Sequence, residues 1–281
     1  MDSKILIKNK SFFELKKDII SLAATYPFLN LRTLARSNLG REIYSITLGN
    51  AEEYVYFLAP FCGNEGLIST LILRFLEELA LSLYKGKEMA GVNIRKATVG
   101  KGIIFIPIIN PDGQEIALKG FTAASYLCDT VKQNTNAPHT QYKYNLRGVY
   151  LENNFYKSAV GAPYKNNFGG YSAFSESESL SIAENLRRFK PRQVVCLNKK
   201  DEKVGVFAPQ NDNRTKEMAD IIKAIYPKPQ EFKNDDKSFY SWVKNEFFAP
   251  CFTVGLGGIT ENTLMEYYDL IKELLVLMLI M

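Results

Sequence analysis

Two long apolar runs place the strongest constraint on the fold of this chain. Tyr54–Ala59 and Gly102–Ile109 are almost continuously apolar, which is typical of strands covered on both faces of a sheet. Between them, Gly66–Tyr84 has the length and apolar content of a long helix. Strands that alternate with helices in this way predict an α/β sheet with helices on both faces.

Further segments continue the alternation. Helices are predicted at Ser11–Ala24, Ser175–Phe189, Thr215–Ile225, Lys237–Asn245 and from Glu261, and strands at Glu42–Leu48, Gln193–Leu197 and Phe252–Leu256. We therefore expect a single domain over residues 1–281, a three-layer α/β/α sandwich with a mixed central sheet whose middle strands are parallel. Ligands of such sheets bind beyond the carboxyl ends of the strands.

Three local patterns refine this prediction. Ser175 followed by Glu178 predicts a capping box at the start of a helix. Asn110-Pro111-Asp112-Gly113 predicts a turn after the second apolar strand. Residues 120–170 have little periodicity and predict a long irregular stretch, which in a compact domain is usually functional or mobile.

Composition excludes several classes of protein. With 46% hydrophobic residues the chain is not disordered, and a net charge of +5 is too small to indicate a nucleic-acid partner. Its one histidine, His139, excludes any mechanism that needs two histidines from one chain. The four cysteines form no Cys-x-x-Cys pair, so we expect reduced thiols rather than a zinc knuckle.

The two ends of the sequence bear on location. Met1–Lys10 lacks the apolar core of a signal peptide, and the apolar run Leu274–Met281 is about half as long as a membrane span. These features predict a cytoplasmic protein without a membrane-spanning segment.

Seven short motifs follow one another in order along nearly the whole chain, most of them at the exits of predicted strands. They are Ser37–Ile43, Phe61–Glu65, Ile106–Gly113, Arg147–Phe155, Phe174–Glu178, Val195–Asn198 and Ala249–Gly257. Together they resemble the motifs of the zinc carboxypeptidases, most closely of the bacterial branch that trims γ-D-glutamyl-diaminopimelate bonds in cell-wall peptides. Pro107–Gly113, which reads P-x-x-N-P-D-G, is the most specific match.

The resemblance implies a metal centre that this sequence only partly retains. In the family, two histidines and a glutamate hold zinc, and a second glutamate is the general base for the zinc-bound water. Here Cys62 stands in the place of the first histidine, Glu65 keeps the carboxylate ligand, and Asn198 stands in the place of the second histidine. Gly255 occupies the general-base position.

The resemblance also implies positions for substrate binding. Arg147, Glu152, Asn153 and Asn154 correspond to the family's pocket for the substrate carboxylate, although Glu152 would repel that group. Lys143 or Arg147 could take the oxyanion-stabilising role, and the spacing does not decide between them.

These replacements lead to a first hypothesis and several alternatives. The first is a catalytically inactive carboxypeptidase-like protein without a metal cofactor that binds peptides or cell-wall fragments. An active metallocarboxypeptidase with displaced ligands Cys62, Glu65 and Cys196, cleaving peptide or γ-D-glutamyl bonds, is the second. A scaffold that binds a protein partner, with its cleft filled by its own aromatic side chains, is the third.

Two single residues have alternative interpretations. Glu65 could cap the long helix that begins near Gly66 instead of binding a metal. Cys62 could be a nucleophile only if a base lay beside it, and His139 lies in a loop with no sequence link to it.

Overall fold

The computed structural model describes residues 5–156, 161–165, 167–199, 205–207, 220, 238–258 and 260–281. Its main feature is a seven-stranded mixed sheet in the order β1-β2-β6-β3-β7-β9-β8. The strands are β1 (Leu29–Arg36), β2 (Glu42–Leu48), β3 (Tyr54–Leu58), β6 (Gly102–Ile106), β7 (Pro191–Asn198), β8 (Gly205–Phe207) and β9 (Cys251–Gly255). The four inner strands β6, β3, β7 and β9 are mutually parallel, and the outer pairings are antiparallel. This confirms the predicted mixed sheet with a parallel middle.

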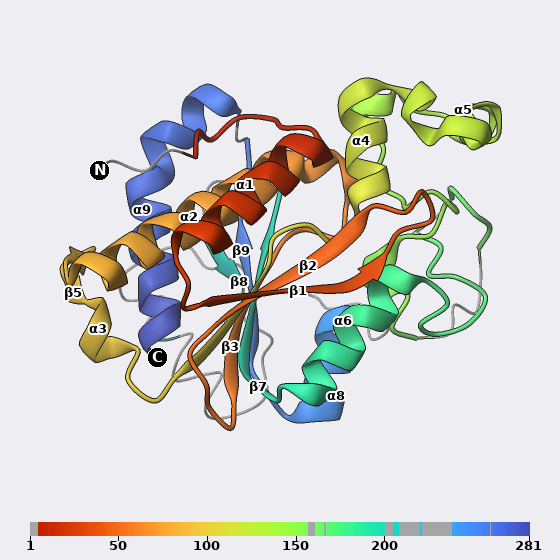
Figure 1. The fold of residues 1–281 in the computed structure, drawn as a ribbon. Coiled ribbons are helices and arrows are strands. Elements are labelled where there is room, and N and C mark those ends of the chain that lie inside the picture. Colours follow the sequence, from red (N-terminus) through yellow and green to blue (C-terminus); the bar gives the residue numbers. More distant parts are fainter. Residues whose placement is uncertain are drawn as a thin grey trace.

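Helices cover both faces of the sheet (Figure 1). On one side lie α1 (Phe12–Thr25), α2 (Gly66–Lys85) and α9 (Glu261–Ile280), and on the other lie α6 (Ser177–Arg188) and α8 (Phe239–Phe247). The shorter helices are α3 (Ile94–Ala97), α4 (Pro111–Lys119) and α5 (Cys128–Asn134), and β4 (Glu88–Met89) pairs with β5 (Val92–Asn93) in a small separate hairpin. Every residue of β3 and β6 is buried, which is why these strands read as continuous apolar runs.

The N-terminal helix forms where its capping signal predicts. Ser11 accepts a hydrogen bond from the Glu14 amide, and the Glu14 carboxylate accepts one from the Ser11 amide, a complete capping box. Phe12, Leu15 and Ile19 are buried at helical spacing below it. At the other end of the chain, the apolar run near residue 281 forms the buried last turns of α9. None of the described helices has both the length and the apolar character needed to cross a bilayer.

Two local predictions were wrong in detail. Asn110 to Gly113 is not a free turn, because Asn110 is the N-cap of α4 and its side chain accepts from the Gly113 amide. Ser175 does not cap α6, whose N-cap is Glu176 without a side-chain capping bond. The hydroxyl of Ser175 instead donates to the Glu176 carboxylate.

Other elements were missed or cannot be compared. Strand β1, whose residues alternate poorly in burial, and the edge strand β8 were not predicted from the sequence. Residues 120–170 contain α5 and short 3-10 turns at Phe121–Leu127, His139–Gln141 and Leu151–Asn153. The helix predicted at Thr215–Ile225 lies outside the described residues, apart from Asp220.

The most specific motif is a packing junction in this fold. The fully buried carboxylate of Asp112 accepts from the Ser37 hydroxyl at 2.8 Å and from the Leu39 amide at 3.0 Å. It also pairs with the Arg41 guanidinium at 2.5 Å. Ser37–Ile43, the first of the seven motifs, is therefore bonded to the start of α4. These bonds fix the loop that follows β6.

Candidate functional site

The carboxyl ends of β3, β7 and β9 meet at one edge of the sheet, and the candidate site residues follow them. Cys62 and Glu65 come after β3, Asn198 ends β7, and Gly255 ends β9. Asn198 and Gly255 are register partners on neighbouring parallel strands. The structure thus places the predicted positions at the edge where ligands of such sheets bind.

The thiol of Cys62 is hydrogen-bonded to a tyrosine. Its Sγ lies 3.6 Å from the Tyr150 hydroxyl, to which it donates. Burial raises the pKa of Cys62 well above its usual value, and the nearby carboxylates of Glu65 and Glu152 raise it further. The side chain is therefore a neutral thiol, whereas the thiolate is the nucleophilic and metal-binding form.

The histidine considered as a base for this thiol makes its contacts elsewhere. The Nδ1 atom of His139, the one histidine of the chain, lies 3.0 Å from the Ala117 carbonyl at the end of α4. Its ring packs edge-on against Phe121 at 6.2 Å between centroids. His139 thus belongs to the α4 side of the molecule, which leaves the nucleophile interpretation of Cys62 without support.

The carboxylate of Glu65 connects two strand exits. Its Oε2 atom accepts from the backbone amide of Lys199 at 2.7 Å. Glu65 occupies the N-cap position of α2, but its side chain makes no capping hydrogen bond. Glu65 therefore stands at the predicted N-cap position of α2, but its side chain does not form the predicted capping hydrogen bond.

A tyrosine from α8 occupies the space beside Asn198. The Asn198 amide donates to the Tyr240 hydroxyl at 2.6 Å, and both side chains are buried. Tyr240 also interacts with Cys196 and Thr253, so Cys196 and Asn198 do point to the same side of β7. Burial raises the pKa of Tyr240 well above its usual value, so the hydroxyl remains protonated.

The residues at the metal positions do not fit zinc. A thiol bonded to one tyrosine and an amide bonded to another replace the two imidazoles of the family. In the described ranges, no three His, Cys, Asp or Glu side chains are grouped so that they could hold a metal. Cys62, Glu65 and Cys196 are within those ranges and are not grouped in this way, so the geometry lends no support to the alternative ligand set formed from them.

The two oxyanion candidates lie in different surroundings. The Lys143 ammonium is 5.3 Å from the centre of the Tyr150 ring, beside Cys62, and it donates to Asn167 at 2.5 Å. The Arg147 guanidinium is 3.5 Å from the Glu176 carboxylate and its side chain is about half exposed, at 54%. Of the two cations, Lys143 is thus the one that stands at the site, a question that spacing alone left open.

The other three residues of the expected carboxylate pocket, Glu152, Asn153 and Asn154, lie in different surroundings. Burial raises the pKa of Cys62, Cys196, Tyr150 and Tyr240, and the charge of Glu152 nearby raises the pKa of each further. The Asn153 amide donates to the Asn167 carbonyl at 3.1 Å near the surface.

Asn154 is directed into the protein. It is fully buried, and its amide donates to Gly169, Ser172 and Ser175. Its carbonyl oxygen accepts from the Glu176 amide and the Ser179 hydroxyl. Because every polar atom of this side chain is engaged, it positions the loop before α6 and offers no group to a ligand, unlike the expected role.

An aromatic block lies behind the site. The rings of Phe155 and Phe239 are 4.8 Å apart between centroids, and Phe61 is 4.9 Å from Phe239. Trp242 packs on Phe155 at 5.1 Å. Tyr240, one residue along α8 from Phe239, is therefore packed against this block, and no pattern in the sequence indicates that α8 reaches the end of β7.

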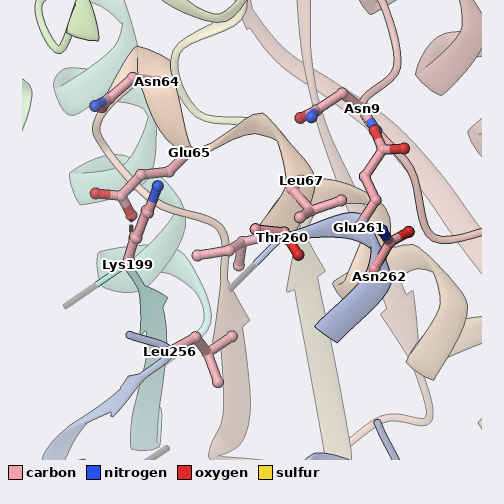
Figure 2. Close-up of a pocket in the computed structure, with 10 residues that line it drawn as sticks. Asn9, Asn64, Glu65, Leu67, Lys199, Leu256, Thr260, Glu261 and Asn262 are labelled. Atoms are coloured by element: carbon pink, nitrogen blue, oxygen red, sulfur yellow. Dashed lines mark hydrogen bonds between the residues drawn. The ribbon is translucent and has the colours of Figure 1, made fainter. Parts of the chain in front are cut away.

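A hollow of about 470 Å³ opens next to Glu65 and Lys199 (Figure 2). It lies between the beginnings of α2 and α9 and includes Glu65 and Lys199 from the site. The described residues that line it are Asn9, Asn64, Glu65, Leu67, Ile68, Lys199, Leu256, Thr260, Glu261 and Asn262. A second hollow of about 220 Å³ shares Asn9 and Asn64 with the first and extends to α4.

Comparisons with known proteins agree with this geometry. The uncharacterized protein YqgT of Bacillus subtilis is 24% identical over 259 residues, which are 86% of this chain and 68% of that protein. Gamma-D-glutamyl-L-diamino acid endopeptidase 1 of Lysinibacillus sphaericus is 22% identical over 280 residues, 95% of this chain and 70% of that protein. A crystal structure of thrombin activatable fibrinolysis inhibitor has a TM-score of 0.76 at 14% identity and covers 99% of this chain and 79% of its own.

A sequence profile described as zinc carboxypeptidase matches residues 15–244, most of the chain. The profile match and the shared fold confirm the resemblance found in the seven motifs. This chain belongs to the zinc carboxypeptidase family.

Proposed function

We propose that this chain is a catalytically inactive member of its family that binds peptides, including cell-wall peptide fragments, without hydrolysing them. The observation that carries the proposal is the pair at the ends of β7 and β9. Asn198 presents an amide that is bonded to Tyr240, and its register partner Gly255 has no side chain. The family's chemistry needs an imidazole at the first of these positions and a carboxylate at the second.

The energetic consequence of these two replacements is large. Loss of a general base alone lowers a rate by roughly a hundred- to ten-thousand-fold. Loss of two imidazole ligands removes the donors that would hold zinc, which when bound polarises the carbonyl and lowers the pKa of water. The two deficits act on the same step, so Lys143 would have no oxyanion to stabilise.

The proposed ligand class rests on one relative and on the hollow. The Lysinibacillus relative is named as an endopeptidase for gamma-D-glutamyl-L-diamino acid bonds. A hollow of about 470 Å³ beside Glu65 is of the size that holds a small ligand. These observations support peptide binding over a scaffold without any small ligand.

An activity assay tests the proposal. The purified chain is incubated with excess zinc and with peptides that contain γ-D-glutamyl-diaminopimelate and ordinary C-terminal bonds, and release of products is measured by mass spectrometry. An active zinc carboxypeptidase serves as the positive control. We expect no release above the rate without protein, with or without zinc, and zinc-dependent product formation that a chelator abolishes would refute the proposal.

A further inference from the structure

The loops that enter the parallel strands lie at the end of the molecule opposite the candidate site. Residues 49–53 lead into β3, 98–101 into β6, 189–190 into β7 and 248–250 into β9. Because these four strands are parallel, their first residues lie along one edge of the sheet. Figure 1 shows this edge at the lower end of the view, together with the last turns of α6 and α8 and the end of α9.

This end of the molecule, called here the amino end, is basic. It comprises residues 49–53, 96–101, 187–192, 246–248 and 279–281, which contain six basic and three acidic residues in a chain whose net charge is +5. The basic residues are Lys96, Lys101, Arg187, Arg188, Lys190 and Arg192, and the acidic ones are Glu52, Glu53 and Glu246. Positive charge is therefore concentrated where the parallel strands begin.

Half of these cations are used within the fold. Lys101 and Arg192 donate to backbone carbonyls at the end of α9. The Arg187 guanidinium pairs with the Glu246 carboxylate at 3.0 Å. These contacts satisfy the last carbonyls of one helix and neutralise one acidic residue.

The other three cations are exposed to solvent. Lys96, Arg188 and Lys190 form no ion pair in the part of the chain that the structure describes. The Arg188 guanidinium lies 5.2 Å from the centre of the Phe189 ring, a contact that leaves its charge in place. These three charges are available to an anionic partner.

Two strongly exposed apolar side chains stand at the same end. Val99 is 78% exposed in the loop before β6, and Phe248 is 87% exposed in the loop before β9. Phe248 is also the C-cap of α8 with a φ of +54°, a left-handed conformation that glycine or asparagine adopts at lower cost. A residue that both strains the backbone and exposes its ring is poorly explained by stability alone.

Positive charge and protruding apolar groups together suit one class of partner. The charges alone would suit any polyanion. A bilayer that contains anionic lipid also offers an apolar layer just below its headgroups, into which side chains such as Val99 and Phe248 can insert. Because these two side chains stand on separate loops, an extended surface can take both at once.

We infer that the amino end docks reversibly on membranes that contain anionic lipid, with Val99 and Phe248 at the level of the headgroups and Lys96, Arg188 and Lys190 beside the lipid phosphates. The inference is independent of the proposed function, because it concerns the opposite end of the sheet. Such docking would leave the candidate site facing away from the membrane.

Vesicle sedimentation tests the inference. The full chain is mixed with vesicles of phosphatidylcholine alone, or of equal parts of phosphatidylcholine and phosphatidylserine, and the sedimented fraction is measured at low and high sodium chloride. We expect binding to the phosphatidylserine vesicles that weakens as salt rises, because salt screens exposed charges. No binding to these vesicles, or equal binding to both compositions, would overturn the inference.

Matched charge variants separate the amino end from the overall charge. Arg188→Gln with Lys190→Gln removes two charges there, and Lys17→Gln with Lys132→Gln removes two exposed charges from α1 and α5. We expect the first pair to weaken binding about thirtyfold, because each basic residue near an anionic surface contributes roughly fivefold, and the second pair to weaken it much less. Equal weakening by both pairs would overturn the inference.

A further variant tests the apolar part of the surface. Phe248→Asn introduces a residue that tolerates the left-handed conformation, so the variant should fold as well as the unaltered chain, which circular dichroism checks. We expect it to bind the phosphatidylserine vesicles about tenfold more weakly, since one ring no longer leaves water. Phe13→Asn, which removes a 67% exposed ring from α1, should bind as the unaltered chain does. Unchanged binding of Phe248→Asn would assign the surface to polyanions in general and overturn the inference.

Discussion

Glu178 is a carboxylate in surroundings that oppose its ionisation. It is fully buried near the start of α6, and one of its oxygens has no hydrogen-bond partner among the described residues. Burial raises its pKa to about 7, and the neighbouring carboxylates of Glu176 and Asp112 add to the effect. The same segment holds Asn154 and Asn145, which fix the loop that carries Lys143 and Tyr150.

The raised pKa predicts how stability depends on pH. In the folded chain Glu178 keeps its proton up to about pH 7, whereas the unfolded chain loses it near 4.5. The folded state therefore binds more protons between these values, and the contribution of Glu178 to stability falls as pH rises from 4.5 to 7. The full loss is about 3 kcal/mol.

Substitution by the neutral isostere tests this. We expect Glu178→Gln to raise the free energy of unfolding by about 3 kcal/mol near pH 8 and to have little effect near pH 4. Urea unfolding at the two pH values measures it. Glu184→Gln, at an exposed position of the same helix, is the control, and an equal response of both variants would contradict the account.

At the scale of elements, α8 accounts for the altered site. It brings Tyr240 to the end of β7, and the ring cluster of Phe239, Phe155 and Trp242 holds it there. On the opposite side of the site, Tyr150 reaches Cys62 from the loop before α6. Cys62 and Asn198, which stand at the family's two histidine positions, are thus both hydrogen-bonded to tyrosine hydroxyls.

The junction between the first motif and α4 is a second feature at this scale. Asp112→Ala would leave the Arg41 guanidinium, which is only 15% exposed, without its carboxylate partner. We expect a loss of about 3 kcal/mol in the free energy of unfolding. Thermal unfolding measures it against Asp269→Ala, whose side chain is largely exposed, and a shift no larger than that control would argue against the junction.

Sequence alone predicted the elements that carry their own signal. Strands β3 and β6 and the capping box at Ser11 could be predicted, because each depends only on residues that are close together in the sequence. The motif order further predicted that Cys62, Asn198 and Gly255 would lie at one edge, as they do.

Contacts between distant segments could not be predicted in this way. The bond from Asn198 to Tyr240 spans 42 residues, and nothing in either local sequence indicates it. The capping function expected of Ser175 failed in part for the same reason, because its hydroxyl accepts from the amide of Asn154, 21 residues away. The position of Lys143 beside the Tyr150 ring and the ion pair of Arg147 with Glu176 were likewise not readable from spacing.

In the whole molecule, the family's architecture is retained while the side chains at its centre differ. The sheet, its covering helices and the convergence of strand ends match solved carboxypeptidase folds. At the centre, Cys62 is hydrogen-bonded to Tyr150 and Asn198 to Tyr240, and a hollow lies beside them at the beginning of α2. Under the proposed function, this fold is present without the family's chemistry.

Restoring the lost residues tests whether the architecture still permits a metal. We expect the triple variant Cys62→His, Asn198→His and Gly255→Glu to bind zinc weakly, because an imidazole at position 198 must displace the Tyr240 hydroxyl. Adding Tyr240→Ala should raise the zinc affinity about tenfold, measured by calorimetry. Equal affinity of the triple and quadruple variants would show that Tyr240 does not close the site.

The most direct test of the central claim is to locate zinc in crystals of the unaltered chain. Crystals grown with excess zinc are measured at wavelengths on both sides of the zinc absorption edge. The account predicts no anomalous peak within bonding distance of Cys62, Glu65 or Asn198, with the Cys62–Tyr150 and Asn198–Tyr240 hydrogen bonds intact. A well-ordered zinc ion bound by those side chains would contradict it.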